Sequence, residues 1–230
     1  MRERGPGFIY LHGFASSPGS TKARAFSSWA EGRGLTLDVL DLRVPSFEGL
    51  RFSAMKEVVR KAIDAVGGPR ARVVLIGSSL GGLLASRVAE EDPRVSSLFL
   101  MAPAFRLAER WRGRLGAAAV GEWEQRGFLE VDDYGTKTRA RIDFGFLEEL
   151  ERLDGGDGRD PWPDVRVPTT IVHGTRDEVV GIDLSRTWAA TKRHVRLIEV
   201  EDGHELGASI PRLLSEATQH LTPFLDSSRP

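Results

Sequence analysis

Three residues of this chain, Ser79, Asp177 and His204, have the side chains and the order that nucleophilic catalysis requires. A serine hydroxyl is a weak nucleophile, so it needs a histidine as general base and an acid that orients this histidine. Each of the three residues follows an apolar run that is typical of a buried strand. Because catalytic groups in open parallel sheets gather beyond the carboxyl ends of the strands, we expect the three side chains to converge.

Ser79 is the central residue of the sequence GSSLG at 77–81, which fits the pattern G-x-S-x-G. The apolar run 73–76 before it predicts a buried strand, and leucines at steps of three and four after it predict an amphipathic helix. A serine on such a sharp strand-to-helix turn exposes its hydroxyl, and its neighbours at 77 and 81 must be small. So short a pattern also arises by chance around an ordinary serine, but this strand–turn–helix context favours a nucleophile.

The acid and the base are expected on loops after the last two predicted strands. Asp177 follows the run TTIV at 169–172, and His204 follows VRLIEV at 195–200. Asp177 could instead be a turn residue that bonds its own backbone, with Glu178 or Asp202 as the acid. Histidines at other places along the predicted elements are weaker candidates for the base: His173, His194 and His220.

A tetrahedral intermediate also needs two backbone donors for its negatively charged oxygen. The amide of Leu80, directly after the serine, is expected to be one of them, and the amide of Phe14 in the loop after the first strand to be the other. We expect His12 to orient this loop by hydrogen bonding. Aromatic residues are candidates for an apolar acyl pocket, although each could be plain core: Phe14, Phe105, Trp111, Phe144 and Phe146.

Short apolar runs alternate with longer amphipathic patterns, which predicts an α/β fold with a parallel sheet. We expect about six mostly parallel strands flanked by helices, in a core formed by 1–103 and 164–230. The Arg-, Glu- and Gly-rich stretch 104–163 is too long for an ordinary connection and predicts a cap or lid of short helices, with a hairpin near Tyr134. The alternative for this stretch is a long peripheral excursion with no role in the site. The predicted strands are 8–11, 35–40, 73–76, 97–101, 169–172 and 195–200, and the predicted helices are about 20–32, 52–66, 80–91, 183–192 and 207–225.

The composition limits the kinds of chemistry and of binding partner that are expected for this chain. The chain has 230 residues, a formal net charge of -1 and no cysteine, so disulfides and cysteine nucleophiles are excluded. The balanced charge gives no reason to expect nucleic acid, and no segment has the length of a membrane span or the apolar core of a signal peptide. We expect a cytoplasmic protein that acts on a small molecule without a metal or other cofactor; the sequence leaves the oligomeric state open.

Two motifs carry a resemblance to a known family. The N-terminal YLHGFASSPGSTKA and the turn IGSSLGG resemble the small bacterial YqiA-like esterases of the α/β-hydrolase superfamily. The resemblance implies hydrolysis of carboxylic or thioester acyl substrates. Members of that family are shorter between the fourth and fifth strands than this chain. The resemblance assigns the triad to Ser79, Asp177 and His204, the oxyanion amides to Phe14 and Leu80, and turn or packing roles to Gly13, Gly77, Gly81 and Gly82.

The sequence therefore predicts a serine hydrolase that cleaves carboxylic esters with short to medium acyl chains. A thioesterase or amidase would use the same triad, and a non-catalytic binding module of the same fold is the alternative from another class. Perhydrolysis or carbon–carbon cleavage on these residues is also open. The four arginines between 106 and 114 could bind an anionic substrate, although a solvated helix face is the simpler interpretation.

Overall fold

A computed structural model describes residues 6–158 and 160–225. A six-stranded sheet in the order β2-β1-β3-β4-β7-β8 forms its centre, and every pair of neighbouring strands is parallel. The four central strands are mostly buried because helices cover both faces of the sheet, while the edge strands β2 and β8 are only partly buried. All six strands are short. Their bounds are β1 Gly7–Leu11, β2 Leu37–Leu40, β3 Val73–Ser78, β4 Val95–Met101, β7 Thr169–Gly174 and β8 Val195–Val200.

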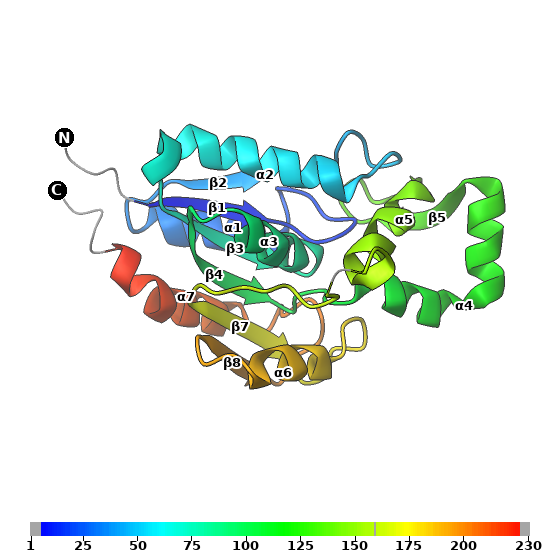
Figure 1. The fold of residues 1–230 in the computed structure, drawn as a ribbon. Coiled ribbons are helices and arrows are strands. Elements are labelled where there is room, and N and C mark those ends of the chain that lie inside the picture. Colours follow the sequence, from blue (N-terminus) through cyan, green and yellow to red (C-terminus); the bar gives the residue numbers. More distant parts are fainter. Residues whose placement is uncertain (1–5, 159, 226–230) are drawn as a thin grey trace.

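The helices divide into two layers, one on each face of the sheet (Figure 1). Alternate strand residues such as Leu75 pack with α2, α3 and α6, and the intervening residues such as Ile76 pack with α1 and α7. This α/β/α arrangement confirms the predicted fold class, and the boundaries differ from the predicted ones by a few residues. The helix bounds are α1 Thr21–Glu31, α2 Phe52–Gly67, α3 Leu80–Glu91, α6 Ile182–Ala190 and α7 Ile210–Leu225, with a short turn η1 at Gly68–Arg70.

The chain between β4 and β7 forms an additional group of elements outside the six-stranded sheet. Helix α4 is interrupted at Gly116, whose φ of 77° and ψ of 161° are not helical, and an antiparallel hairpin follows it. In Figure 1 this group lies beyond the edge of the sheet to which the strand arrows point. Its elements are α4 Leu107–Arg126, β5 Phe128–Asp133, β6 Thr138–Asp143, α5 Gly145–Glu151 and η2 Arg152–Gly156.

This inserted segment is attached to the core by buried polar contacts. Arg87 of α3 is fully buried and donates hydrogen bonds to the carbonyl oxygens of Leu153 (2.8 Å), Asp160 (3.1 Å) and Pro161 (2.9 Å). Within the segment itself, Asp154 accepts hydrogen bonds from the first amides of α4, for which no local side chain acts as a cap.

None of the helices in residues 6–158 and 160–225 combines the length and the apolar character that a bilayer span requires.

Candidate active site

Ser79 occupies a strained turn between β3 and α3. Its φ of 52° and ψ of -114° are unusual for a residue with a side chain, and tertiary hydrogen bonds hold this conformation. The Ser79 amide donates to the Met101 carbonyl (2.9 Å), and the Ser79 carbonyl accepts from the amide of Ala104 (3.0 Å). The turn presents the hydroxyl at the carboxyl edge of the sheet, as the pattern G-x-S-x-G predicts.

The glycines of this turn are required by close backbone contacts. A Cβ atom at Gly77 would lie 2.5 Å from the carbonyl oxygen of Gly81, and one at Gly81 would lie 2.1 Å from the carbonyl oxygen of Leu11. Both distances are too short for any side chain. The turn therefore packs closely against its own helix and against the end of β1. This packing fixes the position of Ser79 relative to the loop after β1.

Ser79, His204 and Asp177 form one hydrogen-bonded chain. His204 Nε2 lies 3.0 Å from Ser79 Oγ, and His204 Nδ1 lies 2.8 Å from Asp177 Oδ2. Since an ionised carboxylate only accepts hydrogen bonds, Nδ1 carries the proton and Nε2 is free to accept the serine proton. The structure thus brings together the three residues that were singled out from the sequence.

Asp177 is placed so that it stays ionised. Its Oδ1 atom accepts hydrogen bonds from the amides of Val179 (2.9 Å) and Val180 (2.7 Å). Its side chain is fully buried, and burial alone would raise the pKa. Hydrogen bonds from His173, His204 and the Val180 amide outweigh burial and hold the pKa of Asp177 well below its ordinary value.

The other acids and histidines considered for the triad have different surroundings. Asp202 accepts from the amides of Gly203 and Ser209 and so shapes the loop that carries His204. Glu178 is exposed. Two of the three weaker histidine candidates bond elsewhere: His194 to the Val165 carbonyl, and His220 to the Ser97 and Thr170 hydroxyls, with burial lowering the pKa of His220 to about 4.

The loop after β1 lies directly beside Ser79. A Cβ atom at Gly13 would be 3.4 Å from the Cβ atom of Ser79. His12 is buried, its Nδ1 donates to the Gly13 carbonyl (2.9 Å), and its Nε2 accepts from the Leu42 amide (3.1 Å). Burial lowers the pKa of His12, so the ring is neutral and orients the loop in which Phe14 follows.

The aromatic residues proposed for a pocket fall into two groups. Phe14 contacts Trp111 edge-on with ring centroids 5.0 Å apart and stacks on Phe146 at 6.2 Å, and Phe144 joins this group through Trp123 at 5.6 Å. Phe105 is fully buried and packs against Trp188 (4.8 Å) and Trp162 (6.0 Å) instead. Within the described chain, no ring contact joins Phe105 to Phe14.

Three residues outside the predicted triad and oxyanion hole contact the loops of this site. His173 is fully buried, with Nε2 3.2 Å from Asp177 Oδ2, and Lys22 Nζ donates to the carbonyl oxygen of Glu205, next to His204, at 2.8 Å. Arg110 of α4 donates to the Val179 carbonyl in the Asp177 loop. Lys22 belongs to the N-terminal motif and His173 lies four residues before Asp177, but their partners become visible only in the folded chain.

The segment between β4 and β7 contacts the loop after β1, which lies beside Ser79. The Gly135 amide, in the turn of the β5–β6 hairpin, donates to the Ala15 carbonyl (3.1 Å) in the loop after β1. Trp111 of α4 packs on Phe14 in the same loop. Among residues 6–158 and 160–225, no group of three His, Asp or Glu side chains is arranged to hold a metal ion.

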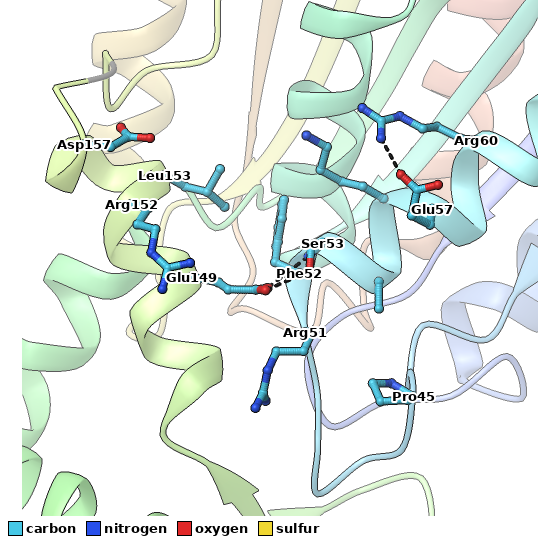
Figure 2. Close-up of a pocket in the computed structure, with 12 residues that line it drawn as sticks. Pro45, Arg51, Phe52, Ser53, Glu57, Arg60, Glu149, Arg152, Leu153 and Asp157 are labelled. Atoms are coloured by element: carbon cyan, nitrogen blue, oxygen red, sulfur yellow. Dashed lines mark hydrogen bonds and ion pairs between the residues drawn. The ribbon is translucent and has the colours of Figure 1, made fainter.

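A separate cavity of about 590 Å³ opens between α2 and the inserted segment (Figure 2). Glu149 of α5 reaches across it and accepts hydrogen bonds from the amide (3.0 Å) and hydroxyl (2.7 Å) of Ser53 at the start of α2. Arg60, also in its wall, pairs with Glu57. The residues that line this cavity do not include those around Ser79, so it is a feature of the junction between core and insertion.

Comparisons with known proteins agree with this architecture. The model of an uncharacterised protein family, UPF0227, matches residues 7–221. A curated relative from Pongo abelii, palmitoyl-protein thioesterase ABHD10, mitochondrial, is 26% identical over 192 residues, and its human counterpart is 25% identical. The matched region is 78% of this chain and 60% of each relative, so the chain spans less than two thirds of their length.

Solved structures show the same fold. Alpha/beta hydrolase domain-containing protein 10 from mouse has a TM-score of 0.76 and 23% identity, and the match covers 97% of this chain and 93% of that one. Est1E from Butyrivibrio proteoclasticus has a TM-score of 0.74 and 16% identity, covering 97% and 90%. These similarities confirm the resemblance to α/β-hydrolases that the motifs carry.

Proposed function

The chain belongs to the uncharacterised protein family UPF0227, within the α/β-hydrolase superfamily, and we propose that it is a serine hydrolase of carboxylic esters. The observation that carries this proposal is the hydrogen-bonded chain from Ser79 through His204 to Asp177, at 3.0 Å and 2.8 Å. A binding module of the same fold has no need of a strained serine aligned with a base and an acid.

In the proposed mechanism Ser79 Oγ attacks the acyl carbon while His204 Nε2 takes its proton. The Phe14 and Leu80 amides bind the oxyanion that forms. The ionised Asp177 stabilises the protonated imidazole, which then gives its proton to the leaving alcohol. Water activated by His204 attacks the acyl-enzyme, and the acid and free Ser79 are released.

We propose that Phe14, Trp111 and Phe146 form the apolar side of the acyl site, with Phe144 behind them. Their mutual ring contacts support this assignment, as does the position of Phe14 next to Gly13, which lies beside Ser79. The segment 104–163 would act as a cap, since it contacts the loop after β1 through Gly135 and Trp111. Such a site suits short to medium acyl chains. A cytoplasmic location stays a prediction.

A thioesterase is the second candidate. The curated relatives at 25–26% identity carry the name palmitoyl-protein thioesterase, and the same triad would cleave a thioester. The two candidates differ in the leaving atom, oxygen or sulfur, and not in the roles of Ser79, Asp177 and His204.

The test is turnover of p-nitrophenyl esters from acetate to palmitate, and of matched acyl thioesters, by wild type and Ser79→Ala. We expect hydrolysis with a clear chain-length optimum and a loss of about a thousandfold or more on removal of the nucleophile. The series that is hydrolysed faster, esters or thioesters, identifies the leaving atom as oxygen or sulfur. Activity that survives in Ser79→Ala, or no turnover of either series, would contradict the proposal.

A further inference from the structure

Arg110 joins the inserted segment to the loop of the triad acid. It lies in the first turns of α4, and its Nη2 atom donates a hydrogen bond to the carbonyl oxygen of Val179. The Val179 amide in turn binds Asp177 Oδ1. A continuous series of contacts therefore leads from Ser79 through His204, Asp177 and Val179 to this arginine.

The guanidinium of Arg110 has an unused donor. Its Nη1 atom is buried and has no hydrogen-bond partner among the described residues. Burial lowers the pKa of Arg110, while the charges of Asp177 and Asp154 raise it, and an arginine stays protonated at neutral pH. A buried cationic donor without an acceptor is unfavourable, and a bound acceptor would relieve this.

Two neighbouring arginines of α4 differ from Arg110 in having carboxylate partners, although Arg106 Nε is also buried without a hydrogen-bond partner among the described residues. Arg106 pairs with Glu109, and Arg112 pairs with Glu151. In the part of the chain that the structure describes, no carboxylate lies within ion-pair distance of Arg110, whose acceptor is a neutral carbonyl. A carboxylate forms a stronger, charge-assisted hydrogen bond with arginine than a carbonyl does.

We propose that Arg110 is a specificity residue that binds a carboxylate on the leaving-group side of the substrate. This inference rests on the proposed function, in which His204 gives its proton to the leaving atom, so the leaving group lies on the side of His204 and Asp177. The acyl group lies on the side of Phe14 and Trp111. Arg110 contacts the Asp177 loop and therefore faces the leaving group.

The test compares esters that share one acyl group and differ only in charge. The probes are the meta and para isomers of acetoxybenzoate, each matched with the neutral acetoxybenzamide. The readout is the ratio of kcat/KM for the acid over kcat/KM for the amide, in wild type, Arg110→Gln and Arg110→Lys. Arg114→Gln removes an exposed positive charge from the same helix and is the control.

We expect the acid to be preferred in wild type for at least one isomer. Arg110→Gln should lower the ratio by about tenfold to about a hundredfold, the range for a charge-assisted hydrogen bond, and Arg110→Lys should restore part of it. Arg114→Gln should leave the ratio within about twofold of wild type, because an exposed charge is screened by solvent. An unchanged ratio in Arg110→Gln would overturn the proposal.

Binding separates this inference from the proposed function. The same four esters are titrated calorimetrically into Ser79→Ala and into Ser79→Ala with Arg110→Gln, where no hydrolysis is needed. Tighter binding of the acid that depends on Arg110 supports the inference even if wild type cleaves none of the esters. Equal binding of acid and amide by Ser79→Ala, or no binding of any probe, contradicts it.

Discussion

Replacement of Gly81 by alanine is expected to disturb both the fold and the site. The added Cβ atom would lie 2.1 Å from the Leu11 carbonyl oxygen, at least 1.3 Å short of the 3.4 Å at which ordinary contact begins. That oxygen belongs to the end of β1 and is followed directly by the loop of Gly13 and Phe14. Both sides of the contact are backbone in a close-packed core, so relief requires the loop and α3 to move apart.

The expected magnitude follows from this displacement. Overpacking of this kind costs about 2–3 kcal/mol, which lowers the melting temperature of a chain of this length by about 4–12 °C. A shift of about 1 Å between the Phe14 amide and Ser79 lowers kcat/KM by about a hundredfold. The measurements are thermal unfolding and hydrolysis of p-nitrophenyl butyrate at a temperature where the variant is folded.

Gly113→Ala is the matched control. A Cβ atom at Gly113 meets nothing within 4 Å, the residue is exposed, and alanine favours a helix over glycine. Its melting temperature should equal or slightly exceed that of wild type, with unchanged activity. If Gly81→Ala instead melts within about 1 °C of wild type and keeps its activity within twofold, the account of the turn is wrong.

Three further predictions concern the surroundings of the site. Lys22→Met should lower kcat/KM by about tenfold because the loop carrying His204 is less well held, and Lys22→Arg should recover most of this loss; steady-state kinetics measures both. The depressed pKa of Asp177 means that its ionised form stabilises the fold above pH about 4, and this contribution is lost as the pH falls further. Urea unfolding should therefore show a stability gap between wild type and Asp177→Asn that narrows below pH about 4, and a constant gap would contradict this. Arg87→Met leaves three carbonyls without their donor and should lower stability by about 3 kcal/mol, or about 6–12 °C in melting temperature, whereas the exposed Arg166→Met should leave the melting temperature unchanged.

Much of the fold was predictable because the sheet is buried on both faces. Strands such as 73–76 read as uninterrupted apolar runs, and the helices between them have clear apolar faces. Strands β1, β3, β4 and β7 extend one or two residues beyond the predicted runs because backbone pairing continues outside them. In β3, for example, Gly77 and Ser78 still pair with β4. Strand β8 matches its predicted range, and β2 begins two residues later than predicted.

The site was predictable to the extent that topology determines it. Ser79, Asp177 and His204 each follow a parallel strand, so the edge at which they meet follows from the strand order. Lys22 and His173 could not be assigned, because their contacts with Glu205 and Asp177 depend on how loops and helices pack.

The inserted segment was predictable only as an interruption. Its arginines and glycines have little periodicity, and the break of α4 at Gly116 depends on a backbone conformation that composition does not reveal. Phe105 illustrates the same limit. Its apolar side chain next to the end of β4 predicts a pocket wall, but its ring partners, Trp188 and Trp162, could not be read from the sequence.

Ser79 is tested most directly as the nucleophile by mass spectrometry of the intact protein and of its peptides after reaction with a fluorophosphonate, which phosphonylates an activated serine. Wild type should gain the mass of one phosphonyl group, on the peptide that contains Ser79, while Ser79→Ala should gain none. Asp177→Asn should react much more slowly, because the imidazole of His204 is no longer held in the tautomer that accepts the serine proton. Wild type that stays unlabelled, or Ser79→Ala that is labelled as fast as wild type, would contradict the assignment of Ser79 as the nucleophile.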